Sequence, residues 1–453
     1  MIDRGQPEQM SAAQTLAAET CDVLVIGGGP GGTTAAAHLA REGRRVIVLD
    51  KDRHPRFHIG ESLLPANLPL FERLGVADRI REIGMPKYGV RFVSPTHDHT
   101  SRLAFADAWD KTLASAYQVR RSAFDHLLLR NAAEVGADVR EGWRAREATF
   151  APRFGGGTVV AVADDGGEHR ISARFIIDAS GRDTFLANRL KSKERNPKHA
   201  SAAIYAHFGD VPRAEGPEEG DISIYWYDHG WFWVIPLADG ATSIGAVCWP
   251  YYLKTRRGTD LDAFLAATIA LCPKLAERMV GARRLTSAEA TGNYSYQSRI
   301  AHGGDDGQSY CLVGDAFAFV DPVFSSGVYL AMSSAEMAVA AVRTCLDRPN
   351  DARAALTRFE RAMARGPQTF SWFIYRVTNP AMRELIMRPR NELRMREAVL
   401  SVLAGDLHRG TPYGRSLLLF KAVYLAAGMF HPRRAWQAWR RRQANIRDPQ
   451  PAG

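Results

Sequence analysis

Residues 21–50, CDVLVIGGGPGGTTAAAHLAREGRRVIVLD, decide the fold. An apolar run at 23–26 stops abruptly at glycine, as expected for a strand that is buried on both faces of a parallel sheet. Residues 33–41 have the alanine and leucine composition of a helix, and residues 46–49 predict a second apolar strand. Strand, helix and strand in this order predict a βαβ unit.

Three glycines with the spacing G-x-G-x-x-G, Gly27, Gly29 and Gly32, join the first strand to the helix. The first allows a tight turn, the second lets backbone approach a pyrophosphate, and the third lets the helix pack on the strand. The helix N-terminus then favours the anion, and Asp50 stands where a carboxylate would bind a ribose hydroxyl. The segment therefore predicts dinucleotide binding, and the motif alone leaves FAD and NAD open.

Composition and charge narrow the class of protein. The chain has 453 residues, with 46% hydrophobic and 24% charged residues, as in soluble globular proteins of two or three cores. Five scattered cysteines without C-x-x-C predict no disulfide framework, no cysteine zinc site and a reducing, cytoplasmic location, and we expect no metal. The longest apolar stretch, 416–430, contains Lys421 and is shorter than the about 18 residues of a membrane span, so we expect none.

The net charge of +10 has much of its excess in HPRRAWQAWRRRQANIR at 431–447. A solvated helix face, a nucleic-acid patch and a docking surface for an acidic partner are the three interpretations. No recognised nucleic-acid module accompanies the patch, so we expect no nucleic-acid partner.

Two later strands also run into turns suited to a cofactor. Residues 175–177 lead into Asp178 and Gly181, and residues 310–313 lead into Gly314. Between them, alternating aromatic runs predict an antiparallel sheet, whose tryptophans form either a sheet core or the wall of a pocket. Because the cofactor segments flank this sheet, we expect a discontinuous cofactor domain. The predicted parts are a loose tail at 1–20, the cofactor domain at 21–189 and 295–351, the sheet domain at 190–294, and a helical region at 352–453.

These segments together resemble the glutathione-reductase-type FAD fold, in the branch shared by aromatic hydroxylases and flavin-dependent halogenases, over residues 21–380. The resemblance implies an α/β fold with an inserted antiparallel-sheet substrate domain and a C-terminal helical region. The residues that it implies for FAD binding are Gly27, Gly29, Gly32, Asp50, Arg121, Asp178, Gly181, Gly314, Asp315 and Pro322.

Three motifs narrow the resemblance to the halogenases. WFWVIP at 231–236 fits their W-x-W-x-I-P, which implies that Trp231 and Trp233, with Phe324, keep substrate away from the flavin. The residues that fit F-x-x-P-x-x-S-x-G, where Ser326 and Gly327 would bind halide, are Phe319, Pro322, Ser325 and Gly327. Lys87 in KYG aligns with the family's essential lysine, although a turn lysine is ordinarily exposed and inert.

The resemblance also implies a reaction. Reduced FAD and oxygen give a C4a-hydroperoxide, halide attacks it, and the hypohalous acid reaches Lys87, which either polarises it as an ammonium or forms a haloamine as an amine. An electron-rich aromatic is then chlorinated or brominated, and a base removes the ring proton. His58, Glu61 and Tyr296 are candidates for that base.

One departure concerns the substrate. Tryptophan-specific halogenases have a glutamate before S-x-G, whereas this chain has Phe324, and FVDPVFSSGV is similar to the phenol and pyrrole branch. Some members of that branch act on substrates tethered to a carrier protein, which is acidic and suits the basic C-terminal segment. Nothing in the chain resembles a second dinucleotide fold, so we expect a separate NAD(P)H-dependent flavin reductase as partner. The other expected partners are an aromatic substrate, either free or on an acyl carrier protein, and a second copy of the chain if the enzyme is a homodimer.

The alternative is a single-component aromatic hydroxylase or a flavin-dependent reductase, identified by reduction of bound FAD by NAD(P)H without a second protein. A non-enzymatic flavoprotein is a third candidate. Chloride or bromide, the ring position, the number of halogens and covalent flavin attachment do not follow from the sequence.

Overall fold

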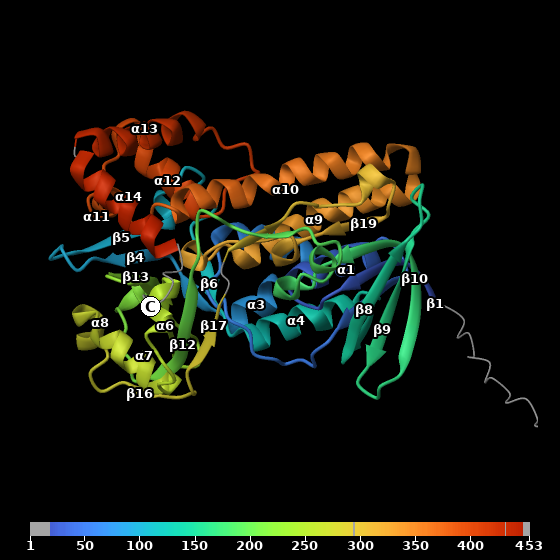
Figure 1. Cartoon of the computed structure of the whole chain (residues 1–453), viewed down its shortest axis with the longest axis horizontal. Coiled ribbons are helices and arrows are strands. Elements are labelled where there is room, and N and C mark those ends of the chain that lie inside the picture. The colour runs from blue at the N-terminus through green and yellow to red at the C-terminus, as the bar shows by residue number, and fades with distance from the viewer. Residues whose placement is uncertain (1–18, 293–294, 431, 447–453) are drawn as a thin grey trace, which may run out of the picture.

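The computed structural model describes residues 19–292, 295–430 and 432–446. The predicted tail at 1–20 therefore lies outside the description up to residue 18. Two sheets occupy opposite ends of the long axis (Figure 1).

The first sheet carries the βαβ unit at its centre. Its strands in spatial order are β7 (Asp138–Glu141), β2 (Val46–Asp50), β1 (Glu19–Ile26), β10 (Glu168–Asp178), β9 (Gly157–Ala163) and β8 (Trp143–Phe150), with β19 (Tyr310–Leu312) also beside β10. The strands β7, β2, β1, β10 and β19 pair in parallel, and β8 and β9 pair in antiparallel fashion. The fully buried runs of β1 and β2 match the prediction of a two-sided parallel core.

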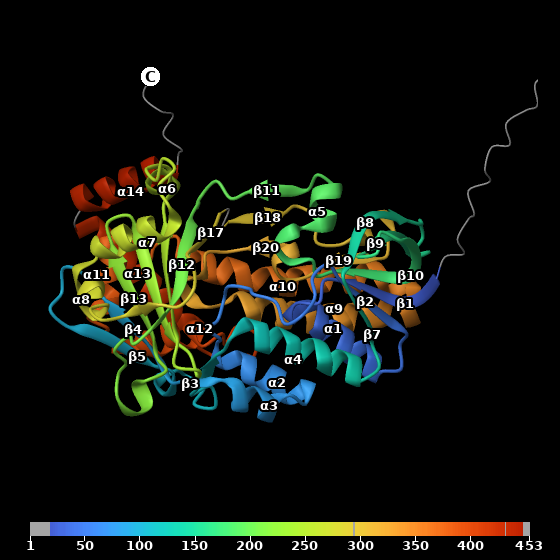
Figure 2. The same cartoon turned by 90° about the horizontal axis from the view of Figure 1, so that it is seen from below.

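Helices pack around α1 (Pro30–Arg41), which begins directly after the glycine turn. α1 contacts both α4 (Arg121–Glu134) and α9 (Gly327–Asp347). The amino ends of α1 and α9 both lie where β1 and β10 end, since Gly31 approaches Ala331 of α9. Figure 2 shows α4 beside α2 (Leu68–Leu74) and α3 (Ala77–Ile83) on one side of this domain.

The second sheet has eight strands and differs from the predicted boundaries. In order they are β16 (Arg283–Arg284), β12 (Ala202–Gly209), β15 (Thr242–Cys248), β14 (Gly230–Pro236), β13 (Ile222–Tyr227), β4 (Gly89–Val93) and β5 (Thr100–Ala104), with β17 (Glu289–Thr291) also on β12. β4 and β5 come from the segment predicted to belong to the cofactor domain. β13 pairs with β4 in parallel, so the sheet is mixed rather than wholly antiparallel. No local pattern reveals this pairing, because its two strands are more than a hundred residues apart.

Successive residues along the strands of this sheet point to opposite faces, and each face packs into a different hydrophobic core. Ile204, Ala206 and Phe232 pack with α7 (Leu261–Ala270) and α8 (Pro273–Arg278) in the smaller core. Trp231 and Trp233 point to the other face and belong to the large core that includes the first sheet. The period of two thus aims both tryptophans at the cofactor domain. The helix α6 (Pro250–Lys254) follows β15.

Short pieces complete the fold. Two small sheets pair β3 (Met85–Lys87) with β6 (Ala116–Gln118), and β18 (Tyr296–Ser298) with β11 (Lys193–Arg195) and β20 (Ala318–Phe319). The C-terminal region is helical, as predicted, and comprises α10 (Ala352–Ile374), α11 (Pro380–Met387), α12 (Met395–Leu403), α13 (Gly414–Phe430) and α14 (Pro432–Ile446). A helix α5 (Phe185–Arg189) follows β10.

Candidate active site

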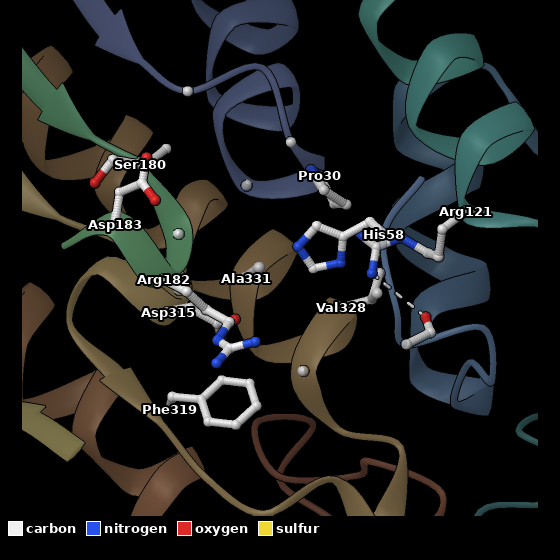
Figure 3. A pocket seen from close by; sticks show the side chains of 18 of the residues that line it. Pro30, His58, Arg121, Ser180, Arg182, Asp183, Asp315, Phe319, Val328 and Ala331 are labelled. Atoms are coloured by element: carbon white, nitrogen blue, oxygen red, sulfur yellow. Dashed lines mark hydrogen bonds between the residues drawn. The ribbon is translucent and has the colours of Figure 1, made fainter. Parts of the chain in front are cut away.

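A cavity of about 800 Å³ lies between the two sheets, at the carboxyl ends of β1, β2 and β10. This is where ligands bind in open α/β sheets, and the volume falls in the range of roughly 300–1,000 Å³ that small-molecule sites occupy. Figure 3 shows Arg182 beside the Phe319 ring on one side of the cavity, with His58 on the other.

The glycine turn forms one end of the cavity. Gly27 has φ +109°, and a Cβ atom there would lie 2.3 Å from the Ala179 carbonyl oxygen, so only glycine fits. Gly27 and Gly29 line the cavity. Gly29 is the N-cap residue of α1, and because glycine has no side chain, no side-chain cap occupies the N–H groups of the first turn. Gly32 does not line it, because its backbone packs against Gly27, with a Cβ there only 1.9 Å from the Gly27 oxygen. Its place is helix packing rather than cofactor contact.

Asp50 lies at the end of β2 and lines the cavity. One carboxylate oxygen accepts a 2.7 Å hydrogen bond from the Gly28 N–H, and the other accepts one from the Asp52 N–H. Arg56 lies 3.8 Å from the same carboxylate. These contacts fix the carboxylate where the sequence predicts a ribose partner.

Asp178 departs from the predicted cofactor contact. Its carboxylate accepts hydrogen bonds from the N–H groups of Ser180 (2.9 Å) and Leu186 (2.7 Å), and it is fully buried outside the cavity lining. It shapes the turn that brings Gly181, with φ +60°, to the cavity. The acid is therefore a structural support for the turn, a role that sequence spacing does not distinguish from ligand contact.

Arg121 lines the cavity at the start of α4. Its guanidinium donates two hydrogen bonds to Asp125, at 2.8 and 2.9 Å, and a third, at 3.0 Å, to the Ile59 carbonyl. It therefore ties the loop at 59–60 to the cavity wall.

Gly314 and Asp315 follow β19 and line the cavity. Gly314 has φ +56° and would clash with Ala331 if it carried a Cβ, 2.9 Å away. Burial raises the pKa of Asp315 to about 6, against the opposing effect of Arg182 and Arg121. This carboxyl group can therefore exchange a proton near neutral pH.

The turn before α9 holds the predicted halide residues. Ser325 has φ +57° and lines the cavity together with Pro322 and Gly327. Ser326 is fully buried and does not line it, and its hydroxyl has no hydrogen-bond partner among the described residues. Space around Gly327 is open, since a Cβ there would meet no atom within 4 Å. The turn thus presents the free amino end of a 21-residue helix and an unpaired buried hydroxyl.

The aromatic wall consists of Trp231 and Trp233, which both line the cavity. The Trp233 indole N–H donates a 3.1 Å hydrogen bond to the Ser243 hydroxyl, and Gly245 lies directly beneath its ring. Phe324 differs from the prediction: it lies outside the cavity lining, with its ring edge-on to Phe373 of α10. The pocket interpretation of the tryptophans therefore suits the structure, whereas Phe324 belongs to the core beneath the turn.

Lys87 ends β3 and is fully buried, unlike an ordinary turn lysine. Its ammonium group donates hydrogen bonds to the Ser62 hydroxyl (2.9 Å) and the Leu63 carbonyl (3.0 Å) and lies 5.2 Å from the Phe105 ring centroid. Burial lowers the pKa of Lys87 to about 7 despite the opposing charge of Asp221. Ser62 lines the cavity and Lys87 does not, so the lysine lies behind its wall.

The three candidate bases occupy different places. His58 lines the cavity, and burial lowers its pKa to about 3. Glu61 also lines it and pairs with buried His207 of β12 at 2.9 Å. Tyr296 lies outside the lining and donates to the Asp315 carbonyl, and burial raises its pKa. Sequence reasoning missed Ser62 and His207, because their partners come from distant segments.

The described residues also show the state of the cysteines and whether they include a membrane-spanning helix or a metal cluster. The five cysteines are all free thiols and are buried. In this part of the chain, no helix has the length and apolarity to cross a bilayer, and no cluster of three metal-ligating side chains occurs.

The comparisons with known proteins agree with this geometry. The family described as "FAD binding domain" matches residues 20–347, and the glycine cradle, Asp50 and the cavity fit that cofactor. The 1H-pyrrole-2-carbonyl-[peptidyl-carrier protein] chlorinase of Pseudomonas fluorescens is 28% identical over 86% of this chain and 90% of its own length. The corresponding brominase of Pseudoalteromonas luteoviolacea is 30% identical over 81% of this chain and 90% of its own. The chain is thus an FAD-dependent oxidoreductase.

A solved structure agrees as well. The myxobacterial chondrochloren halogenase CndH, an FAD-dependent halogenase, superposes with a TM-score of 0.75 and 31% identity over 90% of this chain and 97% of its own. The chain belongs to the flavin-dependent halogenase family and is an enzyme that halogenates an aromatic compound.

Proposed function

We propose that this enzyme chlorinates or brominates a phenol or a pyrrole by directing hypohalous acid to Lys87. The observation that carries the proposal is the buried ammonium group of Lys87, whose pKa is about 7, directly behind the cavity residue Ser62. FAD, when bound and reduced, supplies with oxygen the oxidising equivalents that convert halide into hypohalous acid. The protein's task is to keep that oxidant from water until it meets the lysine.

Binding roles follow from the cavity. Gly27, Gly29 and the amino end of α1 would hold the pyrophosphate, and Asp50 a ribose hydroxyl. The other lining residues proposed for FAD are Arg121, Gly181, Gly314, Asp315 and Pro322.

Halide would bind at the turn before α9. The free N–H groups of Gly327 and its successors, together with the unpaired Ser326 hydroxyl, suit a small anion. Trp231 and Trp233 would form a wall between flavin and aromatic substrate, which suppresses direct hydroxylation.

Lys87 has two chemical options. As an ammonium it donates a hydrogen bond to hypohalous acid and polarises it, and as an amine it forms a haloamine. Both protonation states are populated near pH 7 because burial lowers the pKa to about 7. A halogenation rate that falls as pH rises through 7 identifies the ammonium, and a rate that rises identifies the amine.

The substrate is proposed to arrive on a carrier protein. Two relatives are named for pyrrole carbonyl groups on a peptidyl carrier protein, and the C-terminal segment of this chain is strongly basic. A separate NAD(P)H-dependent flavin reductase is the proposed source of reduced FAD, since the sequence offers one G-x-G-x-x-G βαβ unit. The free buried thiols suit a reducing cytoplasm.

The domain boundaries that we propose are drawn by sheet membership rather than by continuous sequence ranges. The cofactor domain combines segments before and after the second sheet, and β4 and β5 are better assigned to the substrate domain with β12–β15.

The experiment supplies purified enzyme with FAD, NADH, a flavin reductase, oxygen and bromide or chloride. Phenolic and pyrrolic substrates, free and carrier-bound, are assayed by mass spectrometry for halogen isotope patterns. Lys87→Ala should abolish the halogenated product while hypohalous acid still forms. Lys274→Ala is the matched control, because that lysine also donates to backbone carbonyls but lies outside the cavity. A product heavier by one oxygen, formed equally by wild type and Lys87→Ala, would identify a hydroxylase instead.

A further inference from the structure

The last two helices present large apolar side chains to solvent. On α13, Leu418, Leu425 and Met429 are 66%, 59% and 74% exposed. Their spacing of seven and four residues places them along one stripe of the helix. Trp436 and Trp439 on α14 are 55% and 57% exposed. We call these five residues the α13–α14 stripe.

The C-terminal segment that contains α13 and α14 has only basic charged residues. Residues 407–446 contain no aspartate or glutamate. Their basic residues are Arg409, Arg415, Lys421, Arg433, Arg434, Arg440, Arg441 and Arg442. Arg440 lies over the Trp436 ring at 4.7 Å, so a cation and an aromatic anchor are presented together. Exposed aromatic residues within a field of one sign are typical of a protein interface.

Arg442 anchors α14 to the body of the enzyme. Its guanidinium donates a 2.9 Å hydrogen bond to the Lys198 carbonyl and lies over the Tyr375 ring at 5.4 Å. It also lies 3.4 Å from Nδ1 of His199. Figures 1 and 2 both show α14 beside α6 at the end of the molecule that carries the second sheet.

His199 connects this anchor to the cavity. Its Nε2 lies 3.0 Å from the Asp321 carboxylate, which also accepts a 2.7 Å hydrogen bond from Ser201. Asp321 in turn accepts from the Val323 N–H and so holds the start of the turn whose residues Pro322 and Ser325 line the cavity. Three consecutive polar contacts therefore join the inner side of α14 to the halide end of the active site.

We propose that the α13–α14 stripe docks an acidic carrier protein that delivers the aromatic substrate. The inference rests on the proposed function, because it names the surface that receives the carrier-bound substrate. Charge complementarity selects this occupant, because α13 and α14 contain no acidic residue and six basic residues besides the inward-facing Arg442, and such a segment attracts an acidic surface. A second copy of this chain would bring two such fields together, which like-charge repulsion disfavours. The tryptophans supply the central anchors that such interfaces require.

The experiment compares two substrates of one acyl group, the carrier-bound thioester and the free pantetheine thioester. The double variant Trp436→Ala/Trp439→Ala and the single variant Arg440→Glu are measured with each. For the carrier-bound substrate we expect kcat/KM to fall at least about tenfold, the usual cost of losing one interface hot spot. The pantetheine thioester should be turned over at an unchanged rate. Raising salt from 50 to about 300 mM should weaken carrier turnover in wild type more than in Arg440→Glu.

Matched controls change the same residue types elsewhere. Val280→Ala removes an exposed apolar side chain, and Arg170→Glu reverses an exposed charge on β10. Both should leave the two substrates unaffected. Wild type that halogenates neither thioester overturns the proposed function itself. Wild type that uses both equally, or variants that match wild type on the carrier-bound substrate, overturn the docking surface alone.

Two further measurements test whether the α13–α14 stripe binds a second copy of the chain or a membrane surface instead of a carrier protein. Light scattering that shows a wild-type dimer converted to a monomer by Trp436→Ala/Trp439→Ala would overturn the inference in favour of a second copy. Cosedimentation with phosphatidylglycerol vesicles that requires the same tryptophans would overturn it in favour of a membrane surface. A monomer that does not bind such vesicles but binds the carrier supports it.

Discussion

The Lys87 ammonium nitrogen lies 2.9 Å from the Ser62 hydroxyl oxygen, and only Ser62 of the two lines the cavity. The lysine is thus held behind one residue of the wall, with the Leu63 carbonyl as its second acceptor. In the proposed function, a reagent formed in the cavity would meet Ser62 before the amine of Lys87. The relationship makes Ser62 a positioning residue for the proposed chemistry.

Ser62→Ala should lower kcat/KM for halogenation by about tenfold or more, since a hydrogen bond to a charged group contributes roughly 1.5–3 kcal/mol. Formation of hypohalous acid, measured with a trapping reagent and without aromatic substrate, should stay unchanged. Ser101→Ala is the control, because that buried hydroxyl donates to the Ile386 carbonyl away from the cavity. Equal losses in both variants would contradict the role.

The lowered pKa of Lys87 makes stability depend on pH. Unfolded lysine keeps its proton up to a pH of about 10.4, whereas the buried amine loses it near 7. The unfolded state therefore binds more protons between these values, and the free energy of unfolding rises with pH. Relative to Lys87→Met, which has no such group, wild type should gain roughly 3 kcal/mol between pH 7 and 9.5. Denaturant titrations at the two pH values measure the difference, and parallel pH curves would contradict it.

Gly245→Ala should disturb the aromatic wall. A Cβ atom at this position would lie 2.1 Å from the Trp233 ring, so the indole must move and lose its hydrogen bond to Ser243. We expect a fall in halogenated product, a rise in hydroxylated product, and altered tryptophan fluorescence. Gly414→Ala, at the open start of α13, is the control. An unchanged product ratio would argue that Trp233 does not separate flavin from substrate.

Gly32→Ala should abolish tight FAD binding, although Gly32 does not line the cavity. The added methyl would lie 1.9 Å from the Gly27 oxygen, and α1 would be forced off β1. We expect FAD affinity to fall at least about 100-fold, with a lower melting temperature, because overpacking at a rigid backbone costs about 1–3 kcal/mol or more. Titration of apoprotein with FAD tests this, and wild-type affinity would show that the third glycine is dispensable.

The sequence identified the elements that have short-range signals. The strand, glycine turn and helix at 23–41 are determined locally, because buried strands and tight turns restrict which residues fit. Both tryptophans of the motif around Trp231 lie on the same face of the sheet, since a period of two sends alternate residues to one side. Phe324 follows no such period, and only its neighbour Phe373 shows that it faces the core.

By itself, then, the sequence determined the FAD fold, the family motifs and the basic C-terminal segment, because each is written in adjacent residues. Only the tertiary structure decided that β4 joins β13, that Asp178 supports a turn, and that Lys87 is buried against Ser62. It also decided that Arg442 reaches His199, more than two hundred residues earlier. These contacts depend on how distant segments pack, and burial by those segments is what shifts the pKa of Lys87.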